Sequence, residues 1–188
     1  MRLDPFHIVN ALWIVLVTVW AVAALRASPA IRRQPMRSRA AYTLALIAAA
    51  LVMWRWPFDL LGSRFVPRTE LVGWIGAGIT ARGIALAIAA RVFLGRNWSG
   101  TVTVKKDHEL IRRGPYAVVR HPIYSGILLG LLGTAIVVGE ARGLIGLALF
   151  AVAFRVKSLT EEQFMEEQFG GEYRDYKRRV KALIPLVW

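Results

Sequence analysis

The sequence contains no cysteine and few acidic residues. Its 188 residues include 25 lysines and arginines against 12 aspartates and glutamates. The missing thiols exclude a disulfide framework and a cysteine-ligated metal site. A formal net charge of +13 is compatible with nucleic acid, anionic lipid or an anionic ligand as a partner. The positions of the charges along the chain decide among these partners.

Charge is also missing from long stretches of a chain that is 56% hydrophobic, with a mean hydropathy of +0.45. The apolar runs lie at about 6–25, 40–54, 71–94, 123–138 and 143–154. A bilayer core needs about 20 helical residues; the first and third runs supply them, and the second does so only with its flanks. The last two runs are short and closely joined. The pattern predicts an all-α integral membrane protein with about five transmembrane helices, the last two forming a tight hairpin.

The positive residues predict the orientation in the membrane. They gather in 26–39, in 95–122 and in the tail from residue 155, whereas the opposite side has only Arg2, Arg64, Arg68 and Arg142. Positive loops stay preferentially in the cytosol. We therefore expect an N-terminus outside and a C-terminus in the cytoplasm, in a bacterial inner membrane. Most of the charge then marks topology, and no basic, aromatic-rich soluble module remains to bind nucleic acid.

The polar segments predict how the chain is organised. Residues 1–94 hold three transmembrane helices and residues 95–188 a core with a loop, the helical hairpin and a tail, all in one structural domain. Within the tail, 158–169 is typical of a short amphipathic helix that ends at two glycines, and a second polar helix follows over about 172–181. The alternating residues 101–104 favour a brief strand.

One polar stretch, RRGPYAVVRHPIYSG at 112–126, separates two apolar runs. Its Tyr116, His121 and Tyr124 supply rings and hydrogen-bonding atoms, and the helix that Pro122 can open offers free amides at its N-terminus. Such a turn suits a ligand with phosphate, carboxylate or sulfonium groups. It equally suits a polar juxtamembrane loop whose arginines contact lipid phosphates.

Two adjacent glutamates, Glu161 and Glu162, follow the fifth apolar run. They can face the same cavity as the histidine-proline turn, where a carboxylate accepts hydrogen bonds from ribose hydroxyls or an ammonium group. They equally fit acidic residues that complement a helix dipole. Two arginines lie within the third run, where such residues are costly and often functional. Arg91 is close enough to the end to snorkel, whereas Arg82 is deep enough to face a substrate cavity.

The motifs GPY at 114–116, RHPxYxG at 120–126 and EE at 161–162 occur together within about residues 95–185. In this combination they resemble the isoprenylcysteine carboxyl methyltransferase family, which is itself similar to the phospholipid N-methyltransferases. The resemblance implies an integral membrane enzyme that uses S-adenosyl-L-methionine, releases S-adenosyl-L-homocysteine and methylates a lipophilic small molecule or lipid among the membrane lipids. It implies a cofactor pocket at the cytosolic ends of the last helices, covered by the C-terminal helices.

Matching positions imply the site residues, and no metal is expected. The cofactor-binding group is His108, Leu110, Ile111, Tyr116, Arg120, His121, Pro122, Tyr124, Glu161, Glu162, Tyr173, Tyr176 and Arg179. Within it, Arg120 braces the turn or meets the methionine carboxylate, and the last three residues close the pocket. The catalytic group is Lys157, Glu161 and Glu162. Arg155 and Lys157, together with Arg82 from its place in the third run, form the substrate-binding group.

The acceptor stays open at the level of sequence. Carboxyl methyltransferases of this family carry an arginine about four residues before the glutamate pair. Here Lys157 takes that place, which keeps the charge but loses the bidentate fork; a register shifted by one would place Ser158 there. A phospholipid amine acceptor, a reductase with a nicotinamide cofactor and a non-catalytic lipid-binding protein are the alternatives. The sequence does not predict the oligomeric state.

Overall fold

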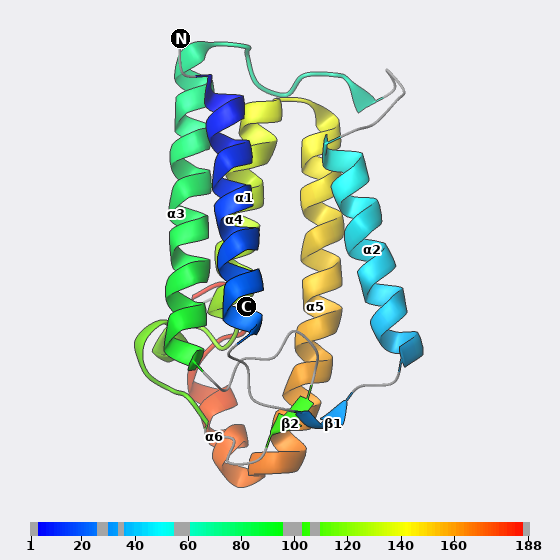
Figure 1. Ribbon diagram of the computed structural model, residues 1–188, viewed down its shortest axis with the longest axis vertical. Coiled ribbons are helices and arrows are strands. Elements are labelled where there is room, and N and C mark those ends of the chain that lie inside the picture. Colours follow the sequence, from blue (N-terminus) through cyan, green and yellow to red (C-terminus); the bar gives the residue numbers. More distant parts are fainter. Residues whose placement is uncertain are drawn as a thin grey trace.

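The computed structural model describes residues 4–25, 30–33, 36–54, 61–95, 103–105 and 110–185. The α-helices in these ranges are α1 (Pro5–Ala24), α2 (Met36–Trp54), α3 (Glu70–Leu94), α4 (Pro122–Val138), α5 (Ala141–Phe169) and α6 (Gly171–Arg179). A 3-10 turn, η3 (Gly114–Ala117), precedes α4, and β1 (Ala30–Arg33) pairs antiparallel with β2 (Thr103–Lys105). The helices α1 to α5 run side by side, and α6 lies with the short strands at their lower end (Figure 1).

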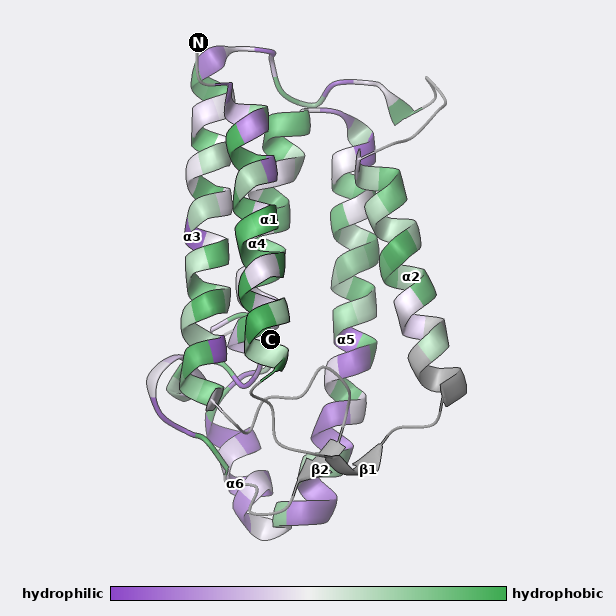
Figure 2. Ribbon diagram, in the orientation of Figure 1, coloured by the Kyte–Doolittle hydropathy of each residue, from purple (hydrophilic) through white to green (hydrophobic). Residues whose placement is uncertain are grey.

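The long helices are apolar, and their composition confirms the predicted helical membrane fold. By length and composition, α1, α3 and α5 can each cross a membrane, while α2 and α4 contribute the shorter apolar segments Tyr42–Trp54 and Pro122–Val138. Hydrophobic residues cover the upper helices, and hydrophilic residues gather on α6 and the lower part of α5 (Figure 2). The chain is therefore an integral membrane protein with a polar end. The number of spans and their direction stay predictions.

The helices α3 and α4 pack with their backbones in contact, which fixes the start of α4. A methyl group added to Gly126 would lie 2.6 Å from the backbone nitrogen of Ala87 and 2.7 Å from the carbonyl oxygen of Gly83. The hydroxyl of Thr80 donates across the interface to the Gly130 carbonyl at 3.1 Å. Small residues allow this close approach between membrane helices.

The predicted hairpin between α4 and α5 is confirmed, and Arg142 secures it. The helix α4 ends at Val138, and Gly139 turns the chain with a φ of 69°. Arg142 donates to the carbonyl of Met53 at the end of α2 (2.9 Å) and to the Glu140 carboxylate (2.6 Å). These bonds tie the ends of α2, α4 and α5 together.

Arg91 closes the opposite end of two helices. Its side chain donates to the Gly95 carbonyl at 2.8 Å and to the Ala23 carbonyl at 3.0 Å. The residue is buried, at 5% exposed, so the expectation that it snorkels toward water is wrong. Its guanidinium instead donates to carbonyls at the C-terminal ends of α1 and α3, where the helices offer few backbone partners of their own.

The helix α5 is longer than the sequence suggests. The apolar run 143–154 and the amphipathic segment 158–169 form one continuous helix, which ends at Gly170 with a φ of 54°. No glycine or proline lies between Gly146 and Gly170, so nothing in the backbone interrupts the helix where its composition changes. The glutamate pair is consequently held on a rigid extension of a membrane helix.

Candidate functional site

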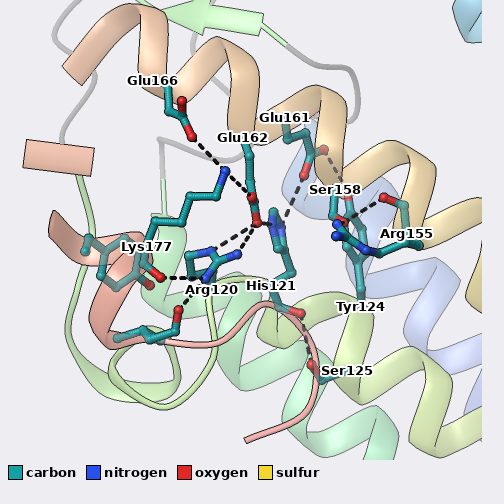
Figure 3. Close-up of polar contacts among 12 residues, drawn as sticks. Arg120, His121, Tyr124, Ser125, Arg155, Ser158, Glu161, Glu162, Glu166 and Lys177 are labelled. Carbon is teal, nitrogen blue, oxygen red and sulfur yellow. Dashed lines mark hydrogen bonds and ion pairs between the residues drawn. The ribbon is translucent and has the colours of Figure 1, made fainter. Parts of the chain in front are cut away.

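The turn before α4 and the C-terminal tail lie against each other at the polar end. The backbone N–H of Arg120 donates to the Lys181 carbonyl at 2.8 Å. The N–H of His121 donates to the Ala182 carbonyl at 2.9 Å. A parallel bridge between Val119 and Lys181 extends this pairing. Two segments about 60 residues apart in the sequence thus form one wall beside the end of α5 (Figure 3).

Glu162 is the central acceptor of this cluster, and its side chain is only 3% exposed. One carboxylate oxygen accepts hydrogen bonds from the Arg120 guanidinium at 2.6 and 3.0 Å. The same oxygen lies 3.1 Å from Nε2 of His121. The other oxygen is 3.2 Å from the Lys177 ammonium. A buried carboxylate with several cationic donors is well compensated, so Glu162 ties the turn and α6 to α5.

Arg120 also holds the end of α6. Its guanidinium donates to the carbonyls of Lys177, at 3.2 Å, and Val180. The sequence left two roles for this residue, bracing the turn or binding the carboxylate of a ligand. The observed contacts favour the first, because they direct the guanidinium to Glu162 and to the carbonyls of α6.

Glu161 faces a different set of groups from its neighbour. It accepts a hydrogen bond from the Tyr124 hydroxyl at 2.6 Å, and it lies 3.5 Å from Nδ1 of His121 and 4.0 Å from the Lys157 ammonium. Its side chain is 24% exposed. Glu162 is thus internal, whereas Glu161 remains accessible to a ligand.

The two ring nitrogens of His121 each face a carboxylate. Burial alone would lower the pKa of His121, but the hydrogen bonds with Glu161 and Glu162 raise it above the ordinary value. With both nitrogens opposite an acceptor, the doubly protonated ring is the form that satisfies both contacts. The histidine therefore contributes positive charge between the two glutamates.

A cationic and aromatic cluster extends from Glu161 toward the membrane helices. The Lys157 ammonium lies 5.1 Å from the ring centroid of Tyr42 and 5.4 Å from that of Tyr124. The Tyr124 ring stacks on His121 at 5.5 Å and on Phe154 at 4.8 Å. Tyr42 comes from α2 and was not predicted, because one tyrosine at the edge of an apolar run carries no signal of its own.

Three buried tyrosines lie on η3 and α6. Tyr176 donates its hydroxyl to the Tyr116 carbonyl at 2.5 Å, and burial raises the pKa of Tyr176 to about 12. Burial also raises the pKa of Tyr116 and of Tyr173. All three remain protonated near neutral pH. Among the described residues, the hydroxyls of Tyr116 and Tyr173 have no hydrogen-bond partner, so both can still donate.

The structure brings most of the predicted site residues together. Those in the cluster are Tyr116, Arg120, His121, Pro122, Tyr124, Lys157, Glu161, Glu162, Tyr173 and Tyr176. Arg155 lies at its edge, with its guanidinium 3.5 Å from the Ser158 hydroxyl. Leu110 and Ile111 are half-buried at the start of the segment that leads to η3. His108 lies outside the described residues.

Two predicted residues are not in the cluster. Arg82 is exposed on α3 and directly precedes Gly83, which packs on α4. Arg179, the last residue of α6, is exposed and donates to the Asp175 carbonyl of its own helix at 3.3 Å. In the described structure neither residue touches the glutamates or the histidine-proline turn.

The fold and the site define a class: a helical integral membrane protein with a buried, charged site at the polar end of its helices. A family model described as phospholipid methyltransferase matches residues 71–172. The match covers more than half of the chain, and the chain belongs to this family.

Curated relatives and a solved structure are also similar. Protein-S-isoprenylcysteine O-methyltransferase of Schizosaccharomyces pombe is 33% identical over 71% of this chain and 56% of its own length. The cobalt-zinc-cadmium resistance protein CzcN of Cupriavidus metallidurans is 34% identical over 56% of this chain and 47% of its own. The chain thus spans about half the length of these relatives. The structure of a eukaryotic intramembrane Ras methyltransferase, isoprenylcysteine carboxyl methyltransferase, matches with a TM-score of 0.56 and 23% identity over 78% of this chain and 53% of that one. This likeness concerns the fold.

Proposed function

We propose that the protein is an S-adenosyl-L-methionine-dependent methyltransferase that acts on the carboxylate of a lipophilic acceptor, as its isoprenylcysteine O-methyltransferase relatives are named to do. One observation carries the proposal. The histidine-proline turn and the glutamate pair, 35 or more residues apart in the sequence, meet in one cluster at the polar end of apolar helices. A polar ligand and a lipid can reach such a place from opposite sides.

The donors and acceptors of the cluster suit that cofactor. Glu161 is accessible and can accept from an ammonium group or ribose hydroxyls. Within the described part of the chain the hydroxyls of Tyr116 and Tyr173 have no partner, so they can donate to a carboxylate or to ring nitrogens. The first turn of α4 has no side-chain cap, so its amides are available to an anionic group. When bound, S-adenosyl-L-methionine supplies a methyl group that is already activated on a sulfonium centre.

The residues of the chain would then align the acceptor and exclude water. A carboxylate is already ionised at neutral pH, since its ordinary pKa is about 4, so it needs no general base. The Lys157 ammonium, beside Glu161, can attract and orient it. The rings of Tyr124 and Phe154, whose centroids are 4.8 Å apart, form an apolar surface that reduces the access of water to the site. Alignment and dehydration account for much of the acceleration available to a displacement of this kind.

The same proposal includes a place in the cell and an organisation of the chain. We expect the C-terminal cluster in the cytoplasm, the N-terminus outside, and the acceptor reaching the site from the bilayer; the bacterial inner membrane is the expected location. Residues 95–188 form the methyltransferase core, supported by the three helices of residues 1–94. The distribution of lysines and arginines supports this orientation.

A phospholipid amine is the second candidate acceptor, because the matching family is described as phospholipid methyltransferase. The two products differ chemically. A methyl ester is released as methanol by mild base, whereas an N-methyl group is stable to acid and base. Incubating the purified protein and membranes with methyl-labelled cofactor, then treating the extracted lipids with base, distinguishes the two acceptors.

Calorimetry with S-adenosyl-L-homocysteine tests the proposal directly. We expect the purified protein to bind it, and Glu161→Gln to weaken binding by about 10- to 100-fold, because the change removes a charged hydrogen-bond acceptor without altering shape. Arg179→Ala is the matched control, since Arg179 is exposed and outside the cluster, and it should bind like the wild type. Folded wild-type protein that does not bind S-adenosyl-L-homocysteine would overturn the proposal.

A further inference from the structure

Lys157 occupies an unusual place between two aromatic rings from different helices. Its ammonium lies 5.1 Å from the ring centroid of Tyr42 on α2 and 5.4 Å from that of Tyr124 on α4. Two ring faces around one positive charge are the arrangement with which proteins bind methylated ammonium ligands. Here a lysine of the chain itself fills that position.

The contacts of Lys157 leave its ammonium able to bind a ligand. The only carboxylate near it in the described structure is Glu161, and 4.0 Å separates the two groups. Within the described residues the ammonium donates no hydrogen bond, although its side chain is only 13% exposed. Lys177 differs, because its ammonium lies 2.7 Å from Glu166 and 3.2 Å from Glu162. Lys177 is bound within the cluster, whereas the three N–H donors of Lys157 remain available.

Packing fixes the Tyr124 ring and the face of α2 that carries Tyr42. The Tyr124 hydroxyl donates to Glu161 at 2.6 Å, and its ring stacks on Phe154 with an interplanar angle of 7°. Leu46, one turn after Tyr42 on α2, packs against the cluster that contains Tyr124 and Phe154. The same face of α2 therefore presents Leu46 and Tyr42 to this region, and Tyr42 is the ring of α2 that touches the lysine.

We propose that Tyr42 is a positioning residue, and that the Tyr42–Lys157–Tyr124 sandwich determines the acceptor's headgroup class by accepting anionic groups and excluding methylated ammonium groups. The inference rests on the proposed function and extends it to specificity. Lys157 already fills the space between the two rings, so an ammonium headgroup cannot bind there. The positive charge of Lys157 also repels it. An anionic headgroup meets three free donors held in place by two ring faces.

Three substitutions separate this role from ordinary packing. Tyr42→Phe keeps the aromatic face, Tyr42→Leu removes it, and Lys157→Gln removes the charge while retaining a polar side chain of similar length. The probes are a short S-prenylated cysteine with a free carboxylate, its methyl ester, and a trimethylammonium amphiphile of matched chain length. Calorimetry in a fixed detergent, with S-adenosyl-L-homocysteine present, gives the affinity for each probe without any need for turnover.

We expect the wild type and Tyr42→Phe to bind the free acid at least about tenfold more tightly than the ester, with Tyr42→Leu losing most of this preference. Lys157→Gln should also lose it and bind the trimethylammonium probe about tenfold more tightly than the wild type does, because the positive charge that repels the probe is gone. Affinity for S-adenosyl-L-homocysteine should not change in the Tyr42 variants.

Several results would overturn the inference while leaving the proposed function intact. One is that Tyr42→Leu keeps its preference for the acid, or that Tyr42→Phe loses this preference as Tyr42→Leu does. Another is that Lys157→Gln gains no affinity for the trimethylammonium probe. A third is that the wild type binds this probe more tightly than the acid. Loss of S-adenosyl-L-homocysteine binding in Tyr42→Leu would indicate a merely structural role and overturn it too. Absence of that binding in the wild type instead contradicts the proposed function.

Discussion

Glu161 and Glu162 are adjacent in the sequence and have different surroundings in the structure. Successive residues of a helix point about 100° apart, so one carboxylate faces the turn and α6 while the other faces Tyr124 and Lys157. Glu162 is nearly inaccessible and Glu161 is not. The sequence identifies the pair, but the rotation of α5 decides which member holds the structure together and which can meet a ligand.

The position of Glu162 predicts a large effect on stability. Glu162→Gln removes one partner of a buried charge cluster, which leaves Arg120 without its carboxylate and His121 with Glu161 alone. We expect this to lower the free energy of unfolding by about 3–5 kcal/mol. Glu166→Gln is the matched control, because it removes a carboxylate from Lys177 at a half-exposed pair. It should cost at most about 1 kcal/mol. Denaturant unfolding in detergent measures both, and equal losses would contradict the assignment.

The charge of His121 predicts how stability depends on pH. The raised pKa of His121 means that the folded state favours the protonated ring. Its contribution is fully present below the unfolded value of about 6.5 and is lost as pH rises through the folded value. The groups that face the ring are Glu161, Glu162 and Tyr124, with Arg120 bound to the same carboxylate.

His121→Asn cannot titrate and is the comparison for this effect. We expect the wild type to be more stable than the variant at pH 6, with the gap narrowing at higher pH. The unfolding midpoints of the wild type and the variant, measured in one detergent from pH 6 upward, give one stability curve for each protein. Parallel curves over that range would show that the ring does not change its charge there.

The sequence predicted most of the residues in the cluster because they lie in short motifs with fixed spacing. It could not predict Tyr42, whose role depends on α2 lying against α5. It also assigned Arg82 to the site from its charge and its place in the third apolar run, and Arg179 from a matching motif position. Charge does not reveal the direction in which a helical residue points, and both side chains are exposed away from the cluster.

At the scale of the elements, the apolar runs predicted where the membrane helices lie. They did not predict how far a helix continues into polar sequence. The bounds of α3 and α4 lie within about a residue of their runs, because hydrophobicity changes sharply there. The predicted break before residue 158 is wrong, since a change from apolar to charged residues does not end a helix. The pairing of β1 with β2 joins segments about 70 residues apart, and such long-range contacts leave no local pattern.

The contact between α3 and α4 predicts opposite effects for two glycine substitutions. Gly126→Ala places a methyl group 2.6 Å from the Ala87 nitrogen, which forces the helices apart at a cost of about 1–3 kcal/mol. Gly78→Ala is the control, because its new methyl group meets nothing within 4 Å. It should stabilise the protein by about 0.5–1 kcal/mol through helix propensity. Thermal unfolding in detergent measures both signs, and similar effects would exclude close packing as the cause.

At the scale of the whole molecule, the polar end and the hairpin end lie at opposite ends of the helices (Figure 1). The hairpin end carries Ser63 in the segment before α3, and the polar end carries Arg174 on α6; both residues are exposed. The distribution of basic residues predicts that these two positions face opposite sides of the membrane.

The absence of cysteine makes this prediction straightforward to test, because an introduced cysteine is the only thiol in the chain. In intact cells, a membrane-impermeant maleimide should label Ser63→Cys and should label Arg174→Cys only after permeabilisation. Each variant is the control for the other, since both thiols react once the membrane is opened. The reverse pattern would place the charged cluster outside the cell. S-adenosyl-L-methionine is made in the cytoplasm, so that outcome would remove the proposed donor from the site while leaving the fold unchanged.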